Sequence, residues 1–274
     1  MDDVLGYAGK RVVVTGAASG MGEATAKLLG ELGAEVIAID MKDIAVRVVQ
    51  SIGLDLRARG SIDEGVAEIE GPIDALFNCA GLPGAPFSDL DVMLVNFVGA
   101  RHLIETVAGK MQPGSAVAYV SSAAGIGWQQ NLDTYLSLFE ADDFDRGKAW
   151  LEANADVYAW SAYAVSKQVI DAWTAWRSIP LFRERGVRLN CTNPGPTDTA
   201  MMPAFHASAG KELVDAALGP IGRYSSAEEQ AWPLVMLNSP RMSYVLGETV
   251  FTDGGFFAAL QTNQVDFGEL TGGG

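Results

Sequence analysis

The stretch TGAASGMG, residues 15–22, joins the first predicted strand of this chain to its first predicted helix. In such a turn Gly16 permits the tight bend, Gly20 lets the backbone come close to a pyrophosphate, and Gly22 allows the helix to pack closely on the strand. The N-terminus of the helix offers unpaired N–H groups and a partial positive charge, which favour a phosphate. The stretch therefore predicts a dinucleotide site, although its G-x-x-x-G-x-G spacing differs from the commoner G-x-G-x-x-G.

Short apolar runs rich in β-branched residues alternate with helix-like stretches around this turn. The apolar runs cover residues 11–15, 34–40, 73–79, 116–121 and 187–191, and a short run at 248–251 could add an edge strand. Helix-like stretches include residues 22–32 and 92–109. Continuous apolar strands separated by helices are typical of a parallel sheet that is covered on both faces. We expect an α/β fold, a single-domain Rossmann-type doubly wound parallel sheet spanning residues 1–274, with a flexible tail at 270–274.

Composition and charge restrict the class of protein further. Hydrophobic residues make up 49% of the 274 residues, which is enough for a large core, and the net charge of −15 disfavours binding to nucleic acid or to an anionic membrane surface. The chain has two cysteines, Cys79 and Cys191, which indicate neither a disulfide framework nor a zinc site. We therefore expect no metal. The N-terminus lacks a signal-peptide pattern and no apolar run reaches about 18 residues, so we expect a cytoplasmic protein.

Asp40 ends the second predicted strand, twenty residues after Gly20. An acid at this position can accept hydrogen bonds from both ribose hydroxyls of an adenosine, and its charge repels a 2′-phosphate. This pattern selects NAD over NADP. Two alternatives stay open: Asp40 could simply cap a surface turn, and Lys42 could tolerate the extra phosphate.

Tyr163 and Lys167 lie four residues apart on a predicted helix, residues 162–176, and therefore share one face. A neighbouring ammonium lowers the pKa of a phenol, so this tyrosine could exchange a proton with a carbonyl or alcohol oxygen. Ser121 and Ser122, the stretch NCAG at 78–81 and the stretch NPGPTDT at 193–199 all follow predicted strands, where open α/β sheets bind ligands. The chain has no G-x-S-x-G motif, which argues against a serine hydrolase.

Taken together, TGAASGMG, NCAG, VNFVGA, VSS, YAVSK and NPGPTDT, followed by TDGG at 252–255, resemble the short-chain dehydrogenase/reductases from Lys10 to about Gly255. The resemblance implies four catalytic residues. Asn96 would hold a water of a proton relay, Ser122 would orient the substrate oxygen, Tyr163 would be the acid and base, and Lys167 would lower the pKa of the tyrosine and hold the nicotinamide ribose. Ser121 is the alternative to Ser122.

The resemblance also implies how NAD would be held. Ser19, Gly20 and Met21 would line the pyrophosphate, while Asp55 and Leu56, at the end of the third strand, would bracket the adenine. Thr197 and Thr199 would contact the carboxamide and a phosphate. The full set of predicted cofactor residues is Gly16, Ser19, Gly20, Met21, Gly22, Asp40, Asp55, Leu56, Asn78, Ala80, Gly81, Tyr163, Lys167, Pro194, Gly195, Thr197 and Thr199.

An insertion at residues 127–161 lengthens the connection between Ser122 and Tyr163. Connections of this length are usually partly helical and functional, although the insertion could also be a surface elaboration with its own small core. With this insertion the chain resembles the branch of the family that contains the bacterial 3α-hydroxysteroid dehydrogenase/carbonyl reductases and the coniferyl-alcohol dehydrogenases. In that branch the insertion is expected to obstruct one helix-pair interface, which implies a homodimer first and a homotetramer second.

The resemblance also implies a substrate loop after NPGPTDT, residues 200–222. Apolar residues in this loop and in the insertion suggest a bulky apolar alcohol or ketone as substrate, such as a steroid, a terpenoid or an aryl alcohol. The predicted contacts are Trp128, Met201, Met202 and Phe205, with Trp150 as a further candidate, although each of them could equally pack a lid. Two other functions stay open on this fold, an NADH-binding sensor or regulatory protein and an epimerase or dehydratase.

Overall fold

The computed structural model of the protein describes residues 3–265, and seven parallel strands form one sheet at its centre. The strand order is β3-β2-β1-β4-β5-β6-β7, so the order reverses between β1 and β4. In open sheets this reversal leaves a crevice at the carboxyl ends of the two strands, where ligands bind. The strands are β1 (Arg11–Thr15), β2 (Glu35–Ile39), β3 (Gln50–Ile52), β4 (Ile73–Asn78), β5 (Met111–Val120), β6 (Arg188–Pro194) and β7 (Thr249–Thr252).

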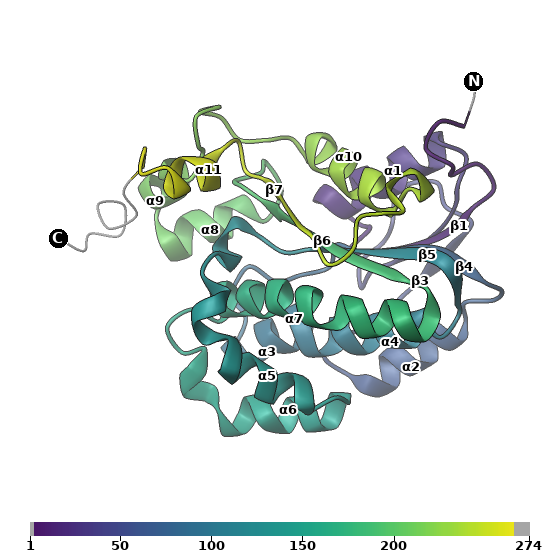
Figure 1. Ribbon diagram of the computed structural model, residues 1–274, viewed down its shortest axis with the longest axis horizontal. Helices are drawn as coiled ribbons and strands as arrows, with labels where there is room; N and C mark the ends of the chain where they lie inside the picture. The colour runs from purple at the N-terminus through teal and green to yellow at the C-terminus, as the bar shows by residue number, and fades with distance from the viewer. Residues whose placement is uncertain (1–2, 266–274) are drawn as a thin grey trace.

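Helices cover both faces of the sheet, as predicted for a doubly wound fold (Figure 1). One face packs against α1 (Gly20–Glu31) and α10 (Ala227–Asn238), and the other against α2 (Arg59–Ala67), α4 (Ala100–Ala108) and α7 (Ala162–Arg185). Successive side chains of a strand point to opposite faces. Val13 therefore belongs to the larger core cluster with Trp173, whereas Val12 and Val14 belong to the smaller one with Leu29.

The predicted helix at 92–109 forms, but it is not regular. It begins as α3 (Asp89–Met93), where the Ser88 side chain accepts a hydrogen bond from the Asp91 N–H. A π-helical stretch, η1 (Leu94–Gly99), then leads without a break into α4. Wide turns of this kind are often found at functional sites, and this one contains Asn96.

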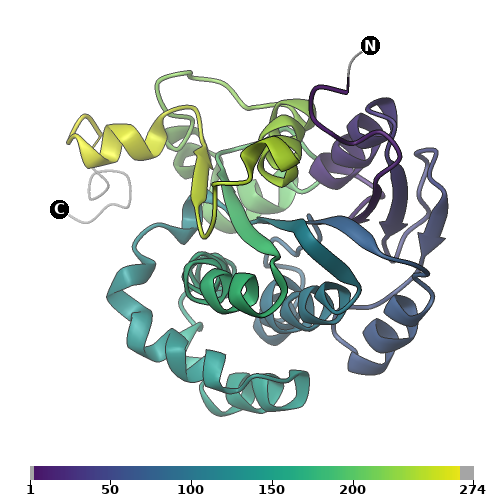
Figure 2. The same cartoon turned by 45° about the vertical axis from the view of Figure 1, so that its right-hand side comes forward.

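The insertion folds into the 3₁₀ turn η3 (Trp128–Asn131), α5 (Leu132–Glu140), α6 (Phe144–Ala153) and the 3₁₀ turn η4 (Ala155–Val157), which confirms that it is partly helical. α5 packs on α7 and α6 packs on η1, so the insertion adds an outer layer beyond the helices that cover the sheet (Figure 2). No helix within residues 3–265 combines the length and the apolar character that crossing a membrane would need.

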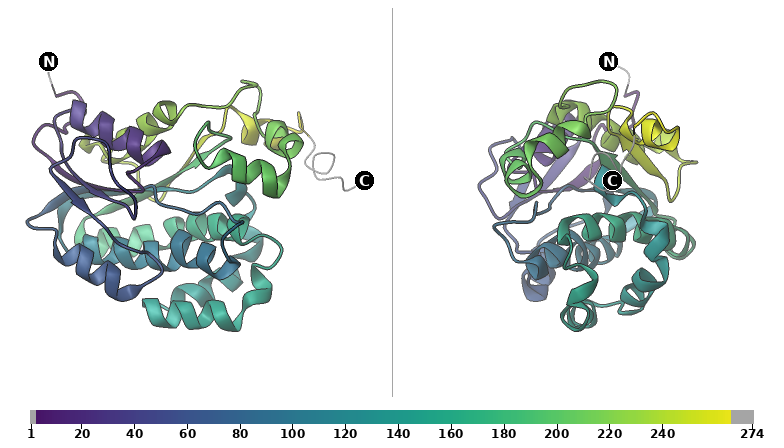
Figure 3. Two further views of the ribbon diagram at one scale, coloured as in Figure 1. Left: turned by 180° about the vertical axis from the view of Figure 1, so that it is seen from behind. Right: turned by 90° about the vertical axis from the view of Figure 1, so that its left-hand side faces the viewer.

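Short helices gather at one end of the sheet (Figure 3). They are α8 (Met202–Ala209), α9 (Lys211–Ala216) and α11 (Phe256–Gln261), while the 3₁₀ turns η2 (Ala123–Gly125) and η5 (Pro240–Met242) follow β5 and α10. α8 and α9 lie in the predicted substrate loop. The tail predicted to be flexible, 270–274, lies outside the described residues.

A buried guanidinium attaches the insertion to the rest of the protein. Arg101 of α4 is 3% exposed, and it donates hydrogen bonds to the carbonyl oxygens of Leu138, Ala141 and Asp143 at 3.2, 2.6 and 2.9 Å. Burial lowers the pKa of Arg101 to about 10, which still leaves it charged at neutral pH. One side chain thus provides hydrogen-bond donors for three backbone carbonyl oxygens where α5 ends and α6 begins.

Replacing this arginine should destabilise the protein. We expect Arg101→Met to lower the free energy of unfolding by about 2–4 kcal/mol, because buried carbonyl oxygens lose their donors while the packing volume is largely kept. Urea denaturation measures the loss. Arg146→Met is the matched control, since Arg146 is an exposed residue of the same insertion and its ion pair with Asp142 should contribute less than about 1 kcal/mol. Equal effects of the two substitutions would contradict the role of Arg101.

Candidate active site

Three glycines shape the turn between β1 and α1. Gly16 and Gly20 have positive φ angles of 68° and 58°, a region that favours glycine. A Cβ on Gly16 would lie 2.8 Å from the N atom of Ala80, and one on Gly22 would lie 2.1 Å from the carbonyl oxygen of Gly16. A Cβ on Gly20 would lie 3.4 Å from the Thr199 side chain, which places Thr199 beside the turn. The turn therefore has the shape of a phosphate cradle at the crevice between β1 and β4.

The carboxylate of Asp40 lies against the same turn. Asp40 Oδ2 accepts a hydrogen bond from the Ala18 N–H at 3.0 Å, and Oδ1 accepts one from the Lys42 N–H at 2.9 Å. Ser19 is the N-cap residue of α1 and Met21 lies in its first turn. The structure thus places the Asp40 carboxylate beside the glycine-rich turn.

The end of β4 is tied to the end of β1. Thr15 Oγ1 donates to Asn78 Oδ1 at 2.9 Å and accepts hydrogen bonds from the N–H groups of Cys79 and Ala80, both at 3.1 Å. The Asn78 side chain is fully buried, and its Nδ2 is one of the buried polar atoms without a partner among the described residues. These contacts hold the NCAG stretch at the crevice, close to the glycine-rich turn.

The two residues predicted to bracket the adenine differ from expectation. β3 ends at Ile52, so Asp55 and Leu56 lie in the following loop and not at the strand end. The Asp55 carboxylate is paired with Arg57 through hydrogen bonds of 2.7–3.1 Å, which lower its pKa. Leu56 is buried, and its carbonyl oxygen would lie 1.9 Å from a Cβ on Gly99. Asp55 could accept a hydrogen bond from adenine only while it shares its oxygens with Arg57.

The two adjacent serines have different surroundings. Ser121 is 3% exposed, and its Oγ donates to the carbonyl oxygen of Lys167 at 3.1 Å. Ser122 is half-buried, its Oγ accepts a hydrogen bond from the Ala124 N–H at 3.2 Å, and it also interacts with the phenol of Tyr163. The structure therefore brings Ser122, and not Ser121, to the tyrosine.

Tyr163 and Lys167 lie in the first two turns of α7. Lys167 Nζ is 5.5 Å from the centre of the Tyr163 ring and donates a hydrogen bond to the carbonyl oxygen of Val120 at 3.1 Å. A Cβ on Gly81 would lie 3.9 Å from that Nζ, so a glycine there leaves space beside the ammonium. Burial lowers the pKa of Lys167 to about 8.

The pKa of Tyr163 is where the structure corrects the sequence prediction. Lys167 was expected to lower it, but burial raises it to about 12, and the interaction with Ser122 offsets only part of this increase. Burial has the larger effect because the ammonium lies over the ring and does not contact the phenol oxygen. At neutral pH the phenol is therefore protonated and ready to donate.

Asn96 was predicted to hold a relay water, but its side chain is already engaged. Its Oδ1 accepts from the Leu82 N–H at 2.7 Å, and its Nδ2 donates to the Leu82 carbonyl oxygen and to Ser166 Oγ, both at 3.0 Å. Its own carbonyl oxygen accepts a hydrogen bond from Tyr119. The side chain instead holds the loop after β4 in place.

β6 leads into the segment in which Thr197 and Thr199 are predicted to contact the carboxamide and a phosphate. Pro194 is the last residue of β6, and a Cβ on Gly195 would lie 2.9 Å from the Cα of Asp253. Thr197 is buried, and its Oγ1 bonds to the Gly195 carbonyl oxygen at 3.0 Å and to Ser225 Oγ at 2.9 Å. Thr197 thus fixes the loop from within, whereas Thr199 faces the glycine-rich turn.

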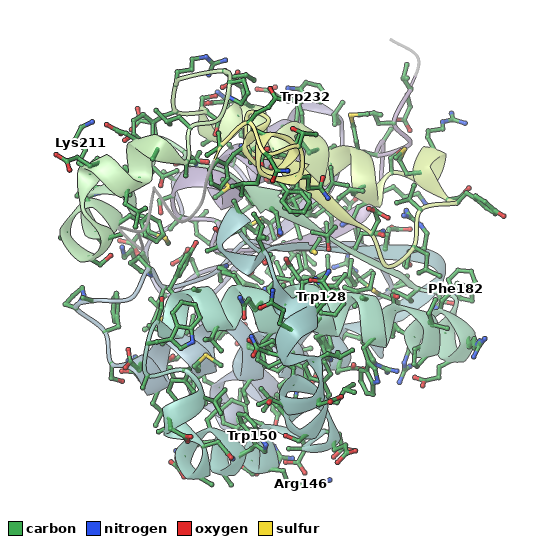
Figure 4. All side chains as sticks on the ribbon, turned by 60° about the vertical axis from the view of Figure 1, so that its left-hand side comes forward. Trp128, Arg146, Trp150, Phe182, Lys211 and Trp232 are labelled. Carbon is green, nitrogen blue, oxygen red and sulfur yellow. The ribbon has the colours of Figure 1, made fainter. Side chains whose placement is uncertain are left out.

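Phe205 of α8, one of the predicted substrate residues, packs against Tyr163. Its ring lies edge-on to Tyr163, with a distance of 4.9 Å between the ring centres. Met202 is buried and Trp128 is partly buried against the core. Trp150 Nε1 donates to Ser137 Oγ within the insertion, and Figure 4 shows Trp150 far from Trp128. The structure therefore does not support Trp150 as a substrate contact.

Sequence reasoning missed two groups near the site. His206, which follows Phe205 in α8, is hydrogen-bonded through its Nε2 to the Tyr224 hydroxyl at 3.1 Å. No sequence motif marks this pair. The other group is Asp171, a buried acid one helical turn after Lys167. Its position on the same helix face was a signal that could have been used.

Comparison with known proteins gives matches over nearly the whole chain. Residues 10–137 match the family described as "short chain dehydrogenase", and residues 150–257 match the one described as "Enoyl-(Acyl carrier protein) reductase". A coniferyl-alcohol dehydrogenase of Pseudomonas sp. (strain HR199 / DSM 7063) is 32% identical, covering 90% of this chain and 96% of that protein. The 3-alpha-hydroxysteroid dehydrogenase/carbonyl reductase of Comamonas testosteroni is 28% identical, with 92% and 98% covered.

A solved structure shows the same fold. The crystal structure of the 3-alpha-hydroxysteroid dehydrogenase from Pseudomonas sp. B-0831 in complex with NADH superimposes with a TM-score of 0.78 at 27% identity, covering 94% of this chain and 100% of that one.

Proposed function

Because the chain belongs to the short-chain dehydrogenase/reductase family, and is thus an oxidoreductase that binds a nicotinamide cofactor, we propose that it transfers a hydride between NAD and a bulky apolar alcohol or ketone. The observation that carries this proposal is the arrangement of Tyr163, Ser122 and Lys167 at the crevice beside the glycine-rich turn. NAD supplies or accepts the hydride when it is bound.

The residues of the crevice fit a dinucleotide. A side chain at Gly16 or Gly22 would clash with the backbone of the turn, Gly20 has a positive φ angle, and the N-terminus of α1 favours a pyrophosphate. Asp40 would accept hydrogen bonds from the adenosine ribose and repel a 2′-phosphate, which supports NAD over NADP. Lys167 would hold the nicotinamide ribose beside Gly81.

The proton transfer would use Tyr163 and Ser122. In ketone reduction the protonated phenol of Tyr163 would donate its proton to the oxygen that receives negative charge, while Ser122 donates a hydrogen bond to that oxygen. In alcohol oxidation the phenolate would remove the hydroxyl proton. Since the pKa of Tyr163 is raised to about 12, reduction has the required protonation state at neutral pH, whereas oxidation should accelerate as the pH rises.

The substrate would bind against the apolar side chains of α8 and the loop before it. Phe205 lies directly on Tyr163, and Met201, Met202 and Trp128 are the other apolar candidates. The names of the two relatives above, a coniferyl-alcohol dehydrogenase and a 3-alpha-hydroxysteroid dehydrogenase/carbonyl reductase, are consistent with a steroid or an aryl alcohol. A homodimer is part of the proposal, because α5 covers part of α7 and would obstruct pairing through that helix.

Truncating Phe205 tests the position of the substrate. We expect Phe205→Ala to lower kcat/KM for a bulky apolar alcohol by about 10–100-fold and for a small alcohol such as isopropanol much less, because only the bulky substrate loses an aromatic wall. Phe182→Ala is the control, since Phe182 is an exposed phenylalanine on α7 away from Trp128 (Figure 4). An equal loss for both alcohols would show that Phe205 does not contact the substrate.

A panel of steroid, terpenoid and aryl alcohols, assayed with NAD and with NADP, tests the proposed function as a whole. We expect turnover of at least one bulky member with formation of NADH. Tight NADH binding without any turnover would favour the sensor, and substrate conversion without net NAD consumption would favour an epimerase or dehydratase.

A further inference from the structure

A carboxyl group that the proposed proton transfer does not use is buried beneath the active site. Asp171 lies on α7 one turn after Lys167 and is 1% exposed. Its Oδ2 accepts a hydrogen bond from Asn193 Nδ2 at 2.7 Å, and its Oδ1 accepts a weak one from Cys191 Sγ at 3.6 Å. Asn193 and Cys191 belong to β6, so the carboxyl group lies between the helix and the sheet.

The backbone is shaped around this carboxyl group. A Cβ on Gly125 would lie 2.4 Å from Asp171 Oδ2 and 3.0 Å from the carbonyl oxygen of Lys167. Gly125 belongs to η2, the 3₁₀ turn that begins directly after Ser122. The acid therefore contacts the turn that carries the catalytic serine as well as the helix that carries the catalytic tyrosine and lysine.

Lys167 is the basic group that acts on Asp171. The other titratable groups around Lys167 and Asp171 are two thiols and a phenol. Cys191 of β6 and Cys79, directly after β4, contribute the thiols, and Tyr163 on the same helix contributes the phenol. Burial raises the pKa of both thiols, so they are neutral at physiological pH. Tyr119 of β5 acts on Cys191 and is likewise neutral, because burial raises its pKa. Asp171 and Lys167 are thus the acid and the base of this group that carry a charge.

A buried carboxylate is costly, and the packing here does not require one. An amide of the same shape could also accept the hydrogen bond from Asn193, without the cost of burying a charge. What an amide could not do is stabilise a neighbouring cation. Lys167 has a carbonyl oxygen, that of Val120, as its hydrogen-bond acceptor, and among the described residues it has no ion pair within 4.0 Å.

We propose that Asp171 is a positioning residue whose negative charge keeps the buried Lys167 ammonium charged, and that its contacts with β6 and Gly125 fix α7 against the turn of Ser122. This inference rests on the proposed function, in which the charged Lys167 holds the nicotinamide ribose beside Tyr163. Asp171 acts through Lys167 and does not contact the reacting atoms.

The two pKa values set the pH range in which this charge matters. Burial raises the pKa of Asp171 to about 6 and lowers that of Lys167 to about 8, and the negative charge of Asp171 is the largest effect that opposes the lowering at Lys167. Removing this charge should lower the pKa of Lys167 further. Ketone reduction needs both Lys167 and Tyr163 protonated. Its loss of activity at high pH should therefore begin at a lower pH than in the unsubstituted protein.

Asp171→Asn removes the charge while it keeps the shape and the acceptor for Asn193. In the pH profile of kcat/KM for ketone reduction with NADH, we expect the loss of activity at high pH to begin about one pH unit lower. Activity should be within about twofold of the unsubstituted enzyme at pH 6 and about fivefold lower at pH 8. Cys191→Ala is the control, because it removes a different hydrogen bond of the carboxyl group without removing a charge, and its profile should not move. An equal loss at both pH values would show that Asp171 has only a structural role.

A second measurement does not depend on activity. NMR of the protein with isotope-labelled lysine follows the titration of Lys167, with Lys167→Met used to assign its signal. We expect a lower midpoint in Asp171→Asn, and an unchanged midpoint would overturn the proposal. If no substrate is turned over, the proposed function fails while this titration still decides the role of Asp171. Asp171→Ser, which also removes the charge, replaces Asp171→Asn if circular dichroism shows that the latter does not fold.

Discussion

Tyr163→Phe should lower turnover by about 10²–10⁴-fold while NADH binding stays nearly unchanged. The substitution removes only the hydroxyl group, and the remaining ring can keep its edge-on contact with Phe205. In the proposed reaction this hydroxyl is the group that gives a proton to the substrate oxygen or takes one from it. Single-turnover kinetics with NADH and a ketone, together with NADH fluorescence titration, would separate the chemical step from binding.

Tyr158→Phe provides the matched control for this experiment. Tyr158 is a buried tyrosine, and its hydroxyl donates to the carbonyl oxygen of Leu151 at 3.0 Å within the insertion. Loss of that hydrogen bond should cost about 1 kcal/mol of stability and leave turnover within about twofold. Near-normal turnover of Tyr163→Phe would reject its role as acid and base, and with it the proposed proton transfer.

Asp40→Ala should change the choice of cofactor. We expect the ratio of kcat/KM with NAD to that with NADP to fall by about 100-fold, because NAD loses hydrogen bonds to a carboxylate and NADP no longer meets a repelling charge. The ratio is the correct readout, since Asp40 also accepts from the N–H groups of Ala18 and Lys42, and loosening the turn would weaken both cofactors alike.

Asp43→Ala serves as the control, since Asp43 is an exposed acid three residues further along. Its removal reduces the net negative charge of the protein by the same amount and should leave the ratio unchanged. If Asp40→Ala also left the ratio unchanged, the proposed ribose contact would be wrong, and Lys42 would become the candidate for binding a 2′-phosphate.

The sequence was sufficient to predict the sheet and its two covering layers, because buried parallel strands are apolar without interruption. It was less informative for elements held by tertiary contacts. β3, Gln50–Ile52, has three residues and only its last one is buried, so no apolar run marks it. α7 was expected to end at Trp176 but continues to Arg185, and it contains Pro180, a residue that usually ends or bends a helix. The π-helical stretch at Asn96 has no sequence signal of its own.

The site was predictable as a set of positions and less so as chemistry. The spacing of Tyr163 and Lys167 correctly places them on one helix face, but it says nothing about how deeply each group is buried. Burial is what determines the direction of the pKa shift at Tyr163, which is opposite to the prediction. In the same way, the choice between Ser121 and Ser122 depends on which hydroxyl lies beside the Tyr163 phenol, and sequence alone does not contain that information.

The way Arg101 binds the insertion has a consequence for protein engineering. A transplanted copy of residues 127–161 would bring its own carbonyl oxygens but not the guanidinium that they need, because that side chain comes from α4. A recipient enzyme with an apolar residue at the equivalent position would therefore accept the segment only as a loosely held appendage. Designers who wish to exchange this segment between homologues should move the arginine with it.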